Sequence, residues 1–154
     1  MKTEVLSHIR LERIIQRIAY QTLESLASEK HVVIAGILPR GIWVAKKLVE
    51  QLNEISDLQI DLVELKIDDP KLEVNCEGKT VLLVDDIVNS GKNMMGAAGF
   101  LYQQHPHRVL TACLIDRMHR RFPIQIDFTG QSLATTLQEH LTLVLDDKPR
   151  IILE

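Results

Sequence analysis

The sequence lacks the features that would mark an unusual class of protein. It has only two cysteines, Cys76 and Cys113, and their spacing fits neither a disulfide framework nor a metal-binding motif. Its apolar runs are all shorter than the roughly 20 residues that a membrane-spanning helix needs. The charged and polar segment 1–16 does not resemble a signal peptide. We therefore expect a cytoplasmic protein with no membrane partner.

The sequence also lacks an excess of charge of either sign. The chain carries 18 Lys and Arg residues against 21 Asp and Glu residues, so its formal net charge is −3. Such a balance gives no overall attraction to nucleic acid or to an acidic membrane. The 154 residues are 45% hydrophobic and 25% charged, which is typical of a soluble globular domain. We expect a single domain over residues 1–154 with one sizeable core.

Apolar segments of strand length alternate with segments of helical periodicity. The first helix is expected to be capped by Ser7 and to run to about residue 28. Strands separated by helices in this way predict a parallel α/β sheet that is flanked by helices. The expected strands are 31–37, 58–67, 80–84, 108–115, 141–145 and 150–153, and further helices are expected from residue 41 and over 94–104.

The chain is organised around the stretch 80–101. Its first five residues are apolar or β-branched and suit a strand buried on both faces. Two carboxylates, Asp85 and Asp86, follow at once, so the strand is expected to end there, at the sheet edge where open α/β folds bind ligands. A polar loop then leads into a helix, and its free backbone N–H groups could hold a phosphate. The loop residues are Asn89, Ser90, Gly91, Lys92 and Asn93.

Simpler explanations of this stretch exist. An Asp-Asp pair can merely end a strand in solvent. The same pair occurs at the first strand of response-regulator receiver domains, but only 68 residues follow Asp86, too few for a domain of about 100 residues or more. A Walker A loop does not fit, because its first glycine would fall at Asp86 and its Ser or Thr at Asn93. A sugar phosphate, which needs both hydroxyl acceptors and a phosphate loop, explains the whole stretch.

A second strand–turn–helix segment lies earlier in the chain. The strand 31–37 leads into a turn that contains Pro39, Arg40 and Gly41, and a helix follows directly. The helix N-terminus together with Arg40 makes a second anion site.

These two loops, in this order, resemble the pyrophosphate and ribose-phosphate loops of type I phosphoribosyltransferases. The run 33–48 (VIAGILPRGIWVAKKL) and the segment 114–130 are similar in particular to the pyrimidine operon regulator/uracil phosphoribosyltransferase family. The resemblance implies a glycosyltransferase that moves ribose 5-phosphate from phosphoribosyl pyrophosphate, with Mg²⁺, to a nucleobase, expected to be a pyrimidine. It also implies a small C-terminal hood over the site and a homodimer or a higher homo-oligomer.

The resemblance assigns a role to each candidate residue. The carboxylates would bind the ribose hydroxyls and reach Mg²⁺ through the ribose or water, the polar loop would hold the 5′-phosphate, and the earlier turn would hold the pyrophosphate. We also predict that the peptide bond before Pro39 is cis, because a cis bond is least unfavourable before proline. The residues expected to act in catalysis are Asp85, Asp86 and Arg40, and those expected to bind substrate are Leu38, Pro39, Gly41, Asn89, Ser90, Gly91, Lys92, Asn93, Asp116 and Arg117, the last two beside the base.

Two departures from the family qualify this expectation. Active members carry a long mobile loop that closes over the substrate, whereas the segment 69–79 has 11 residues. The alternative is therefore a regulator on the same fold that senses phosphoribosyl pyrophosphate or a nucleotide without turning it over. The RNA-contacting face also looks eroded, so RNA is not expected as a partner. His119 and Arg120 remain on this face. Five positions carry residues that differ from those of the relatives, namely Gln16, Tyr20, Pro39, Gln125 and Gln131.

Overall fold

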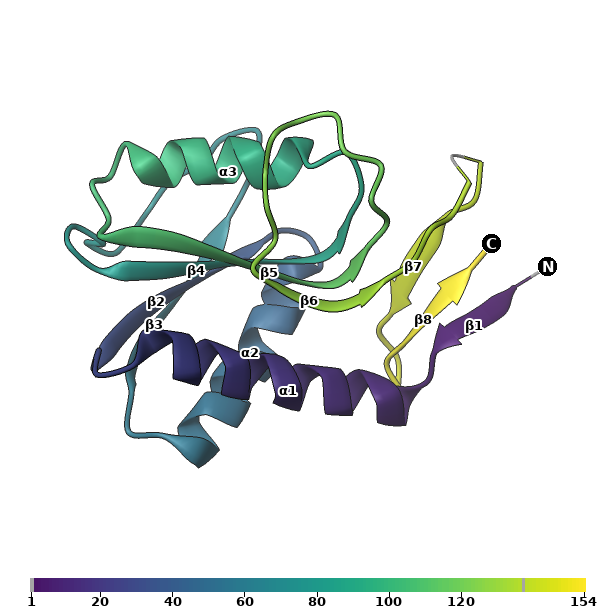
Figure 1. Ribbon diagram of the computed structural model, residues 1–154, viewed down its shortest axis with the longest axis horizontal. Coiled ribbons are helices and arrows are strands. Elements are labelled where there is room, and N and C mark those ends of the chain that lie inside the picture. Colours follow the sequence, from purple (N-terminus) through teal and green to yellow (C-terminus); the bar gives the residue numbers. More distant parts are fainter. Residues whose placement is uncertain (1, 137) are drawn as a thin grey trace.

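The computed structural model describes residues 2–136 and 138–154 and shows a central parallel sheet flanked by helices (Figure 1). The five strands are arranged in the order β3-β2-β4-β5-β6, and all neighbouring pairs are parallel. This confirms the expected fold class. The strands are β2 (His31–Ile37), β3 (Gln59–Leu65), β4 (Thr80–Val88), β5 (Arg108–Asp116) and β6 (Phe128–Ser132).

Helices cover both faces of this sheet. The helices α1 (His8–Leu26) and α2 (Gly41–Ile55) pack on one face, and α3 (Lys92–Tyr102) packs on the other. Ser7 caps α1 as predicted, because its Oγ accepts a hydrogen bond from the N–H of Arg10 at 3.3 Å. Since helices lie on both sides, the central strands β2 and β4 are buried on both faces for most of their length.

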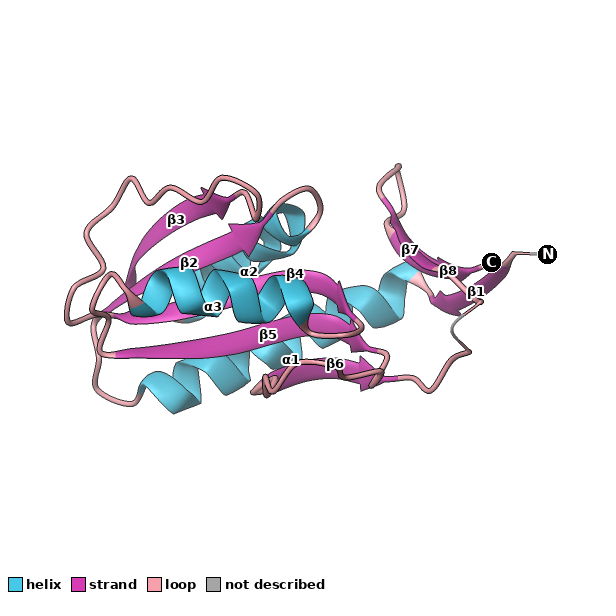
Figure 2. Cartoon of the chain, turned by 90° about the horizontal axis from the view of Figure 1, so that it is seen from above, coloured by secondary structure: helices cyan, strands magenta, loops and turns pink. Residues whose placement is uncertain are grey.

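A second, antiparallel sheet of three strands lies beyond the carboxyl ends of the parallel strands (Figure 2). Its order is β1-β8-β7, so it joins the two termini of the chain, and it forms the expected hood. Two short strands of the structure, β1 and β6, were not predicted. Both are set by pairing with segments far away in the sequence rather than by their own pattern. The strands of this sheet are β1 (Thr3–Leu6), β7 (Leu141–Val144) and β8 (Arg150–Leu153).

The strand β4 is longer than predicted. It was expected to end before Asp85, but it runs on to Val88 because the ladder with β5 continues as far as Asp116. Asp85 and Asp86 therefore lie within the strand, as the sixth and seventh of its nine residues. The carboxylates still lie near the carboxyl edge of the sheet, where the loop to α3 begins.

The connection between β3 and β4 is packed rather than free. It spans residues 66–79 and contains no helix or strand. Cys76 is buried, and Leu72 and Val74 pack beside it against the α3 side of the core. Cys113 is a second buried, unpaired cysteine in β5. No helix among the described residues has the length and apolar character needed to cross a bilayer.

Candidate active site

The carboxyl group of Asp85 is the most buried acid of the candidate site. Asp85 is 9% exposed, and its Oδ1 accepts a hydrogen bond from the N–H of Asp86 at 2.8 Å. Burial, and then the neighbouring charge of Asp86, raise the pKa of Asp85 to about 9. The carboxyl group is therefore neutral at pH 7 and becomes ionised when a cation or hydroxyl donors stabilise its charged form.

The pyrophosphate turn lies beside this carboxyl group. The Leu38–Pro39 peptide bond is cis, as predicted. The N–H of Leu38 donates to the carbonyl of Leu65 at 2.9 Å, which fixes the turn to the end of β3. A Cβ atom added at Gly41 would stand 2.6 Å from the carbonyl oxygen of Val84, so α2 begins in direct contact with β4. The turn and the carboxylates are thus brought together, as expected.

Arg40 connects the same turn to the hood. It is exposed, and its Nε donates to the carbonyl of Leu143 in β7 at 3.2 Å. Neither of its Nη atoms has a hydrogen-bond partner within residues 2–136 or 138–154. The side chain can therefore still offer N–H donors to an anion at the N-terminus of α2.

The loop after β4 is the segment that is expected to hold a phosphate. It borders a hollow of about 220 Å³, and Asp85 lines the same hollow. Gly91 has a φ of +84°, a conformation that favours glycine. Within the described chain, the N–H groups of Ser90 and Gly91 have no hydrogen-bond partner. The other lining residues are Ile87, Val88, Asn89, Lys92, Asn93 and Met94.

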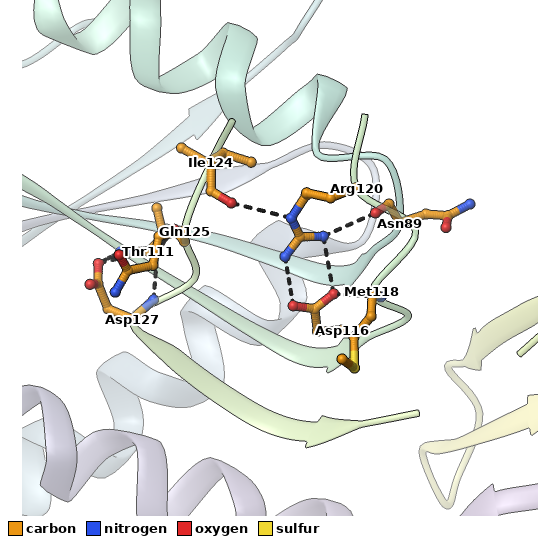
Figure 3. A network of polar contacts seen from close by, with 8 residues as sticks. All are labelled: Asn89, Thr111, Asp116, Met118, Arg120, Ile124, Gln125 and Asp127. Carbon is orange, nitrogen blue, oxygen red and sulfur yellow. Dashed lines mark hydrogen bonds and ion pairs between the residues drawn. The ribbon is translucent and has the colours of Figure 1, made fainter. Parts of the chain in front are cut away.

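Arg120 binds Asp116 at the base-side end of the site. Its guanidinium donates to both carboxylate oxygens, at 2.6 and 3.0 Å, and to the carbonyl of Asn89 at 2.9 Å (Figure 3). The carboxylate of Asp116 also accepts the N–H of Met118 at 2.8 Å. Asp116 is therefore connected to the loop after β4 through an ion pair that the sequence analysis did not foresee, and its contact with the base stays a prediction. In the sequence, Arg120 is part of the family pattern and of the RNA-contacting face but has no assigned role in the site; its i, i+4 spacing from Asp116 was the available signal.

Arg117 is not brought to the site by its side chain. The residue is buried, and its guanidinium donates to Thr135 Oγ1 at 2.7 Å and to the carbonyls of Thr136 and Glu139, each at 2.8 Å. These contacts hold the segment that leads from β6 to the hood. Its expected contact with the base stays a prediction, which these hydrogen bonds do not support.

Asp85 and Asp86 fit a cation that is bound mainly by the phosphates of the substrate. Within the part of the chain that the structure describes, no three His, Cys, Asp or Glu side chains gather in a metal-binding group. Asp85 and Asp86 can supply one or two carboxylate oxygens, and Mg²⁺ is commonly held in this way together with substrate phosphates. A cation would also favour the ionised form of the buried Asp85.

An acidic pair between two loops that each lead into a helix N-terminus, at the carboxyl edge of a parallel sheet, is the arrangement of the phosphoribosyltransferase class. The chain belongs to the phosphoribosyl transferase domain family, whose model matches residues 1–140. The bifunctional protein PyrR of Streptococcus mutans is 32% identical to this chain, and the match covers 99% of this chain and 96% of that protein. PyrR of Streptococcus pyogenes is 33% identical over 93% and 90% of the two chains, and PyrR of Enterococcus faecalis is 29% identical over 96% and 92%.

Solved structures share the same fold. The hypoxanthine phosphoribosyltransferase of Trypanosoma cruzi matches with a TM-score of 0.77 and 15% identity, over 85% of this chain and 81% of that chain. A hypoxanthine-guanine phosphoribosyltransferase of Bacillus anthracis matches with a TM-score of 0.75 and 18% identity, over 86% and 84%. At these identities the likeness concerns the fold alone.

These findings confirm the resemblance to the pyrimidine regulators and the assignment to the phosphoribosyltransferase type of glycosyltransferase. The relatives' name assigns them two roles. A second role in these relatives does not fit the expectation that RNA is not a partner of this chain.

Proposed function

We propose that the protein transfers ribose 5-phosphate from phosphoribosyl pyrophosphate to a nucleobase and releases pyrophosphate. One observation carries this proposal: Asp85 touches the pyrophosphate turn through Gly41 and also lines the hollow of the phosphate loop. A ligand with a phosphate, a ribose and a pyrophosphate in sequence would meet all three groups at once. Asp85 and Asp86 would accept hydrogen bonds from the ribose hydroxyls.

The reaction would depend on positioning and charge rather than on a protein nucleophile. A base nitrogen forms the bond to the ribose C1 and gives up its proton to water, while the bond from C1 to the pyrophosphate oxygen breaks and the pyrophosphate leaves with its electron pair. Arg40 and the N–H groups at the start of α2 would stabilise the charge on the departing pyrophosphate. Mg²⁺, which phosphoribosyltransferases generally use with this substrate, would add positive charge at the same phosphates when bound.

A pyrimidine is the proposed base, and uracil is the first candidate. Its support is the similarity to the PyrR proteins, which extends over nearly the whole chain. The purine enzymes among the solved structures are under 25% identical and say nothing about the base. The base would lie between Asp116 at the end of β5 and the hood.

Calorimetric titration with phosphoribosyl pyrophosphate and Mg²⁺ tests the proposal, followed by pyrophosphate release with a panel of bases. The wild type should bind and should release pyrophosphate with one base. The variant Asp85→Asn/Asp86→Asn should lose binding, whereas Asp57→Asn, an exposed acid ahead of β3, should not. Absence of binding by the wild type would refute the proposal.

A sensor without turnover is the second candidate. The packed connection between β3 and β4 favours it, because Cys76 is 1% exposed and anchors the segment that stands where relatives have a closure loop. A site that stays open to water stabilises the transition state less well. Binding of phosphoribosyl pyrophosphate without release in the presence of any base would establish this role.

RNA binding is a third candidate role. The exposed face of α1 carries Arg10, Arg13 and Arg17, and the relatives are named bifunctional. Arg10 and Arg17 are partly engaged, since they donate to Gln131 and to the carbonyl of Gly130. Filter binding to an attenuator hairpin tests this role, and affinity that falls steeply with salt would support it.

A further inference from the structure

The carbonyl groups of the phosphate loop are held from one side. The carbonyl of Asn89 accepts from Nη1 of Arg120 at 2.9 Å (Figure 3), and the carbonyl of Ser90 accepts from the N–H groups of Arg121 and Phe122 at 2.9 and 3.1 Å. Residues 120–122 therefore contact two successive peptide groups of the loop. We call residues 117–124 the base-side turn.

The orientation of these carbonyls determines where the loop N–H groups point. In a trans peptide the C=O and N–H point in opposite directions. Since the carbonyls of Asn89 and Ser90 face the base-side turn, the N–H groups of Ser90 and Gly91 face away from it. Neither N–H has a partner in the described chain. Successive free N–H groups of this kind make an anion-binding nest.

We propose that Arg120 is a positioning residue that turns the N–H of Ser90 toward the 5′-phosphate, beside the N–H of Gly91 that the backbone of residues 121–122 orients, and that its ion pair with Asp116 couples the base side of the site to the phosphate side. The proposal rests on the proposed function and identifies what orders the phosphate loop. Arg120 itself does not touch the reacting atoms; its side chain acts through the carbonyl of Asn89, while the backbone N–H groups of Arg121 and Phe122 hold the carbonyl of Ser90.

The guanidinium group is held firmly enough for this role. It pairs with both oxygens of Asp116, a bidentate contact that fixes the plane of the group. Its Nε also donates to the carbonyl of Ile124 at 3.2 Å. Four of its five N–H donors are thus used inside the protein, which leaves one for an outside partner such as RNA.

The close packing of Gly91 confirms that loop and turn form one unit. A Cβ atom at this position would stand 2.5 Å from Cγ2 of Ile124 and 2.9 Å from Cδ of Arg120. The loop lies directly on the Arg120 side chain because residue 91 has no side chain. A movement of the base-side turn is therefore transmitted to the phosphate loop.

The test uses ribose 5-phosphate, a probe that needs the phosphate loop but neither a base nor turnover. Calorimetric titration of the full chain is expected to show an affinity about 10–100-fold weaker for Arg120→Ala than for wild type, as expected for lost charged hydrogen bonds. Arg121→Ala is the matched control, because that side chain is exposed and makes no hydrogen bond in the described structure. Its affinity should stay within about twofold of wild type.

Chemical rescue separates positioning from general stability. Guanidinium at millimolar concentration, far below denaturing levels, should restore much of the affinity of Arg120→Ala and should leave Arg121→Ala unchanged. Arg120→Lys keeps the charge but cannot pair with Asp116 through two parallel hydrogen bonds, so it should bind more weakly than wild type. This variant decides the question if Arg120→Ala fails to fold.

The outcomes are distinct. If wild type binds ribose 5-phosphate and the folded Arg120 variants bind equally well, the positioning role is wrong and the proposed function stands. If the wild type does not bind ribose 5-phosphate, the inference is wrong, and the titration with phosphoribosyl pyrophosphate and Mg²⁺ decides the proposed function separately. Selective loss in the Arg120 variants with rescue by guanidinium establishes the positioning role.

Discussion

Gly41 lies directly against Asp85. A Cβ atom at Gly41 would stand 3.1 Å from Oδ1 of Asp85 and 2.6 Å from the carbonyl oxygen of Val84. The first residue of α2 and the buried acid of β4 are therefore in van der Waals contact. This contact sets the distance between the pyrophosphate turn and the ribose carboxylates, so the two halves of the site cannot shift independently.

We expect Gly41→Ala to damage both stability and ligand binding. The new methyl group would meet backbone atoms of β4, and α2 would have to move outward. Overpacking of this kind destabilises a protein by about 1–3 kcal/mol. Thermal unfolding should show the loss, and titration with phosphoribosyl pyrophosphate and Mg²⁺ should show a weaker affinity.

Gly96→Ala is the matched control for that substitution. Gly96 lies in the exposed interior of α3, and a Cβ atom there would have nothing within 4 Å. The change should raise stability by about 0.5–1 kcal/mol because alanine favours the helix. Wild-type stability and binding in Gly41→Ala would contradict the close contact.

Asp85→Asn should stabilise the fold at neutral pH. The pKa of Asp85 is raised to about 9 in the folded protein, so the unfolded chain loses this proton first as the pH rises above about 4. Wild-type stability therefore falls between about pH 4 and pH 9, and asparagine removes that loss. The amide oxygen can still accept the N–H of Asp86.

The expected gain in the free energy of unfolding is about 1–3 kcal/mol at pH 7, and it should vanish near pH 3, where both states of the wild type are protonated. Urea unfolding at the two pH values measures it. A gain of equal size at both pH values would show that the charge of Asp85 is not the cause. The same variant should bind phosphoribosyl pyrophosphate poorly, so stability and function are opposed at this residue.

Much of the fold could be predicted because its signals are local. Buried apolar runs such as 80–84 and the amphipathic pattern of α1 require only neighbouring residues to be recognised. The strands β1 and β6 were missed because their hydrogen bonds are made with partners more than ten residues away, on β8 and β5. For the same reason β4 extends past its acidic pair: the ladder with β5 overrides the polarity of Asp85.

The site could be predicted in its outline but not in its connections. The two loops and the acidic pair follow each other in the sequence, and the structure brings them together. The functions of Arg117 and Arg120 could not be predicted from the sequence. Both arginines follow β5, and they differ in the direction in which their side chains point. Arg117 reaches the segment before the hood, whereas Arg120 reaches the phosphate loop. Side-chain direction in an irregular turn depends on the folded backbone, which no periodicity reveals.

Binding of phosphoribosyl pyrophosphate with Mg²⁺ should release a proton. The carboxyl group of Asp85 is neutral below about pH 9 in the free protein, and both a cation and ribose hydroxyls favour its ionised form. The affinity should therefore rise with pH by up to about tenfold per unit between pH 6 and pH 8. Titrations in buffers of different ionisation enthalpy measure the proton release directly.

Asp86→Asn provides the control for this proton release. The charge of Asp86 is the second cause of the raised pKa of Asp85, after burial. Removal of that charge should lower the pKa of Asp85 and reduce the number of protons released at pH 7. Equal release by wild type and variant would show that burial alone keeps Asp85 neutral.

Arg117→Ala should loosen the segment that leads to the hood while leaving the phosphate loop intact. The buried guanidinium donates one hydrogen bond each to Thr135, Thr136 and Glu139. Its loss would leave the carbonyls of Thr136 and Glu139 without this donor. A loss of about 2–4 kcal/mol is expected, which corresponds to several degrees in Tm for a chain of this size.

Hydrogen exchange should locate the effect of Arg117→Ala. Exchange at Leu133 and Thr135 should accelerate, while the affinity for ribose 5-phosphate should stay within about twofold of wild type because Arg120 still holds the loop. Arg13→Ala, a change at an exposed arginine of α1, should alter neither quantity. An unchanged Tm with a raised KM for the base would instead place the Arg117 side chain on the base, as the family resemblance implies. Three of the five N–H donors of Arg117 are bound to the hood segment, so a role at the base would fall to Nη1 or would require the side chain to leave those hydrogen bonds.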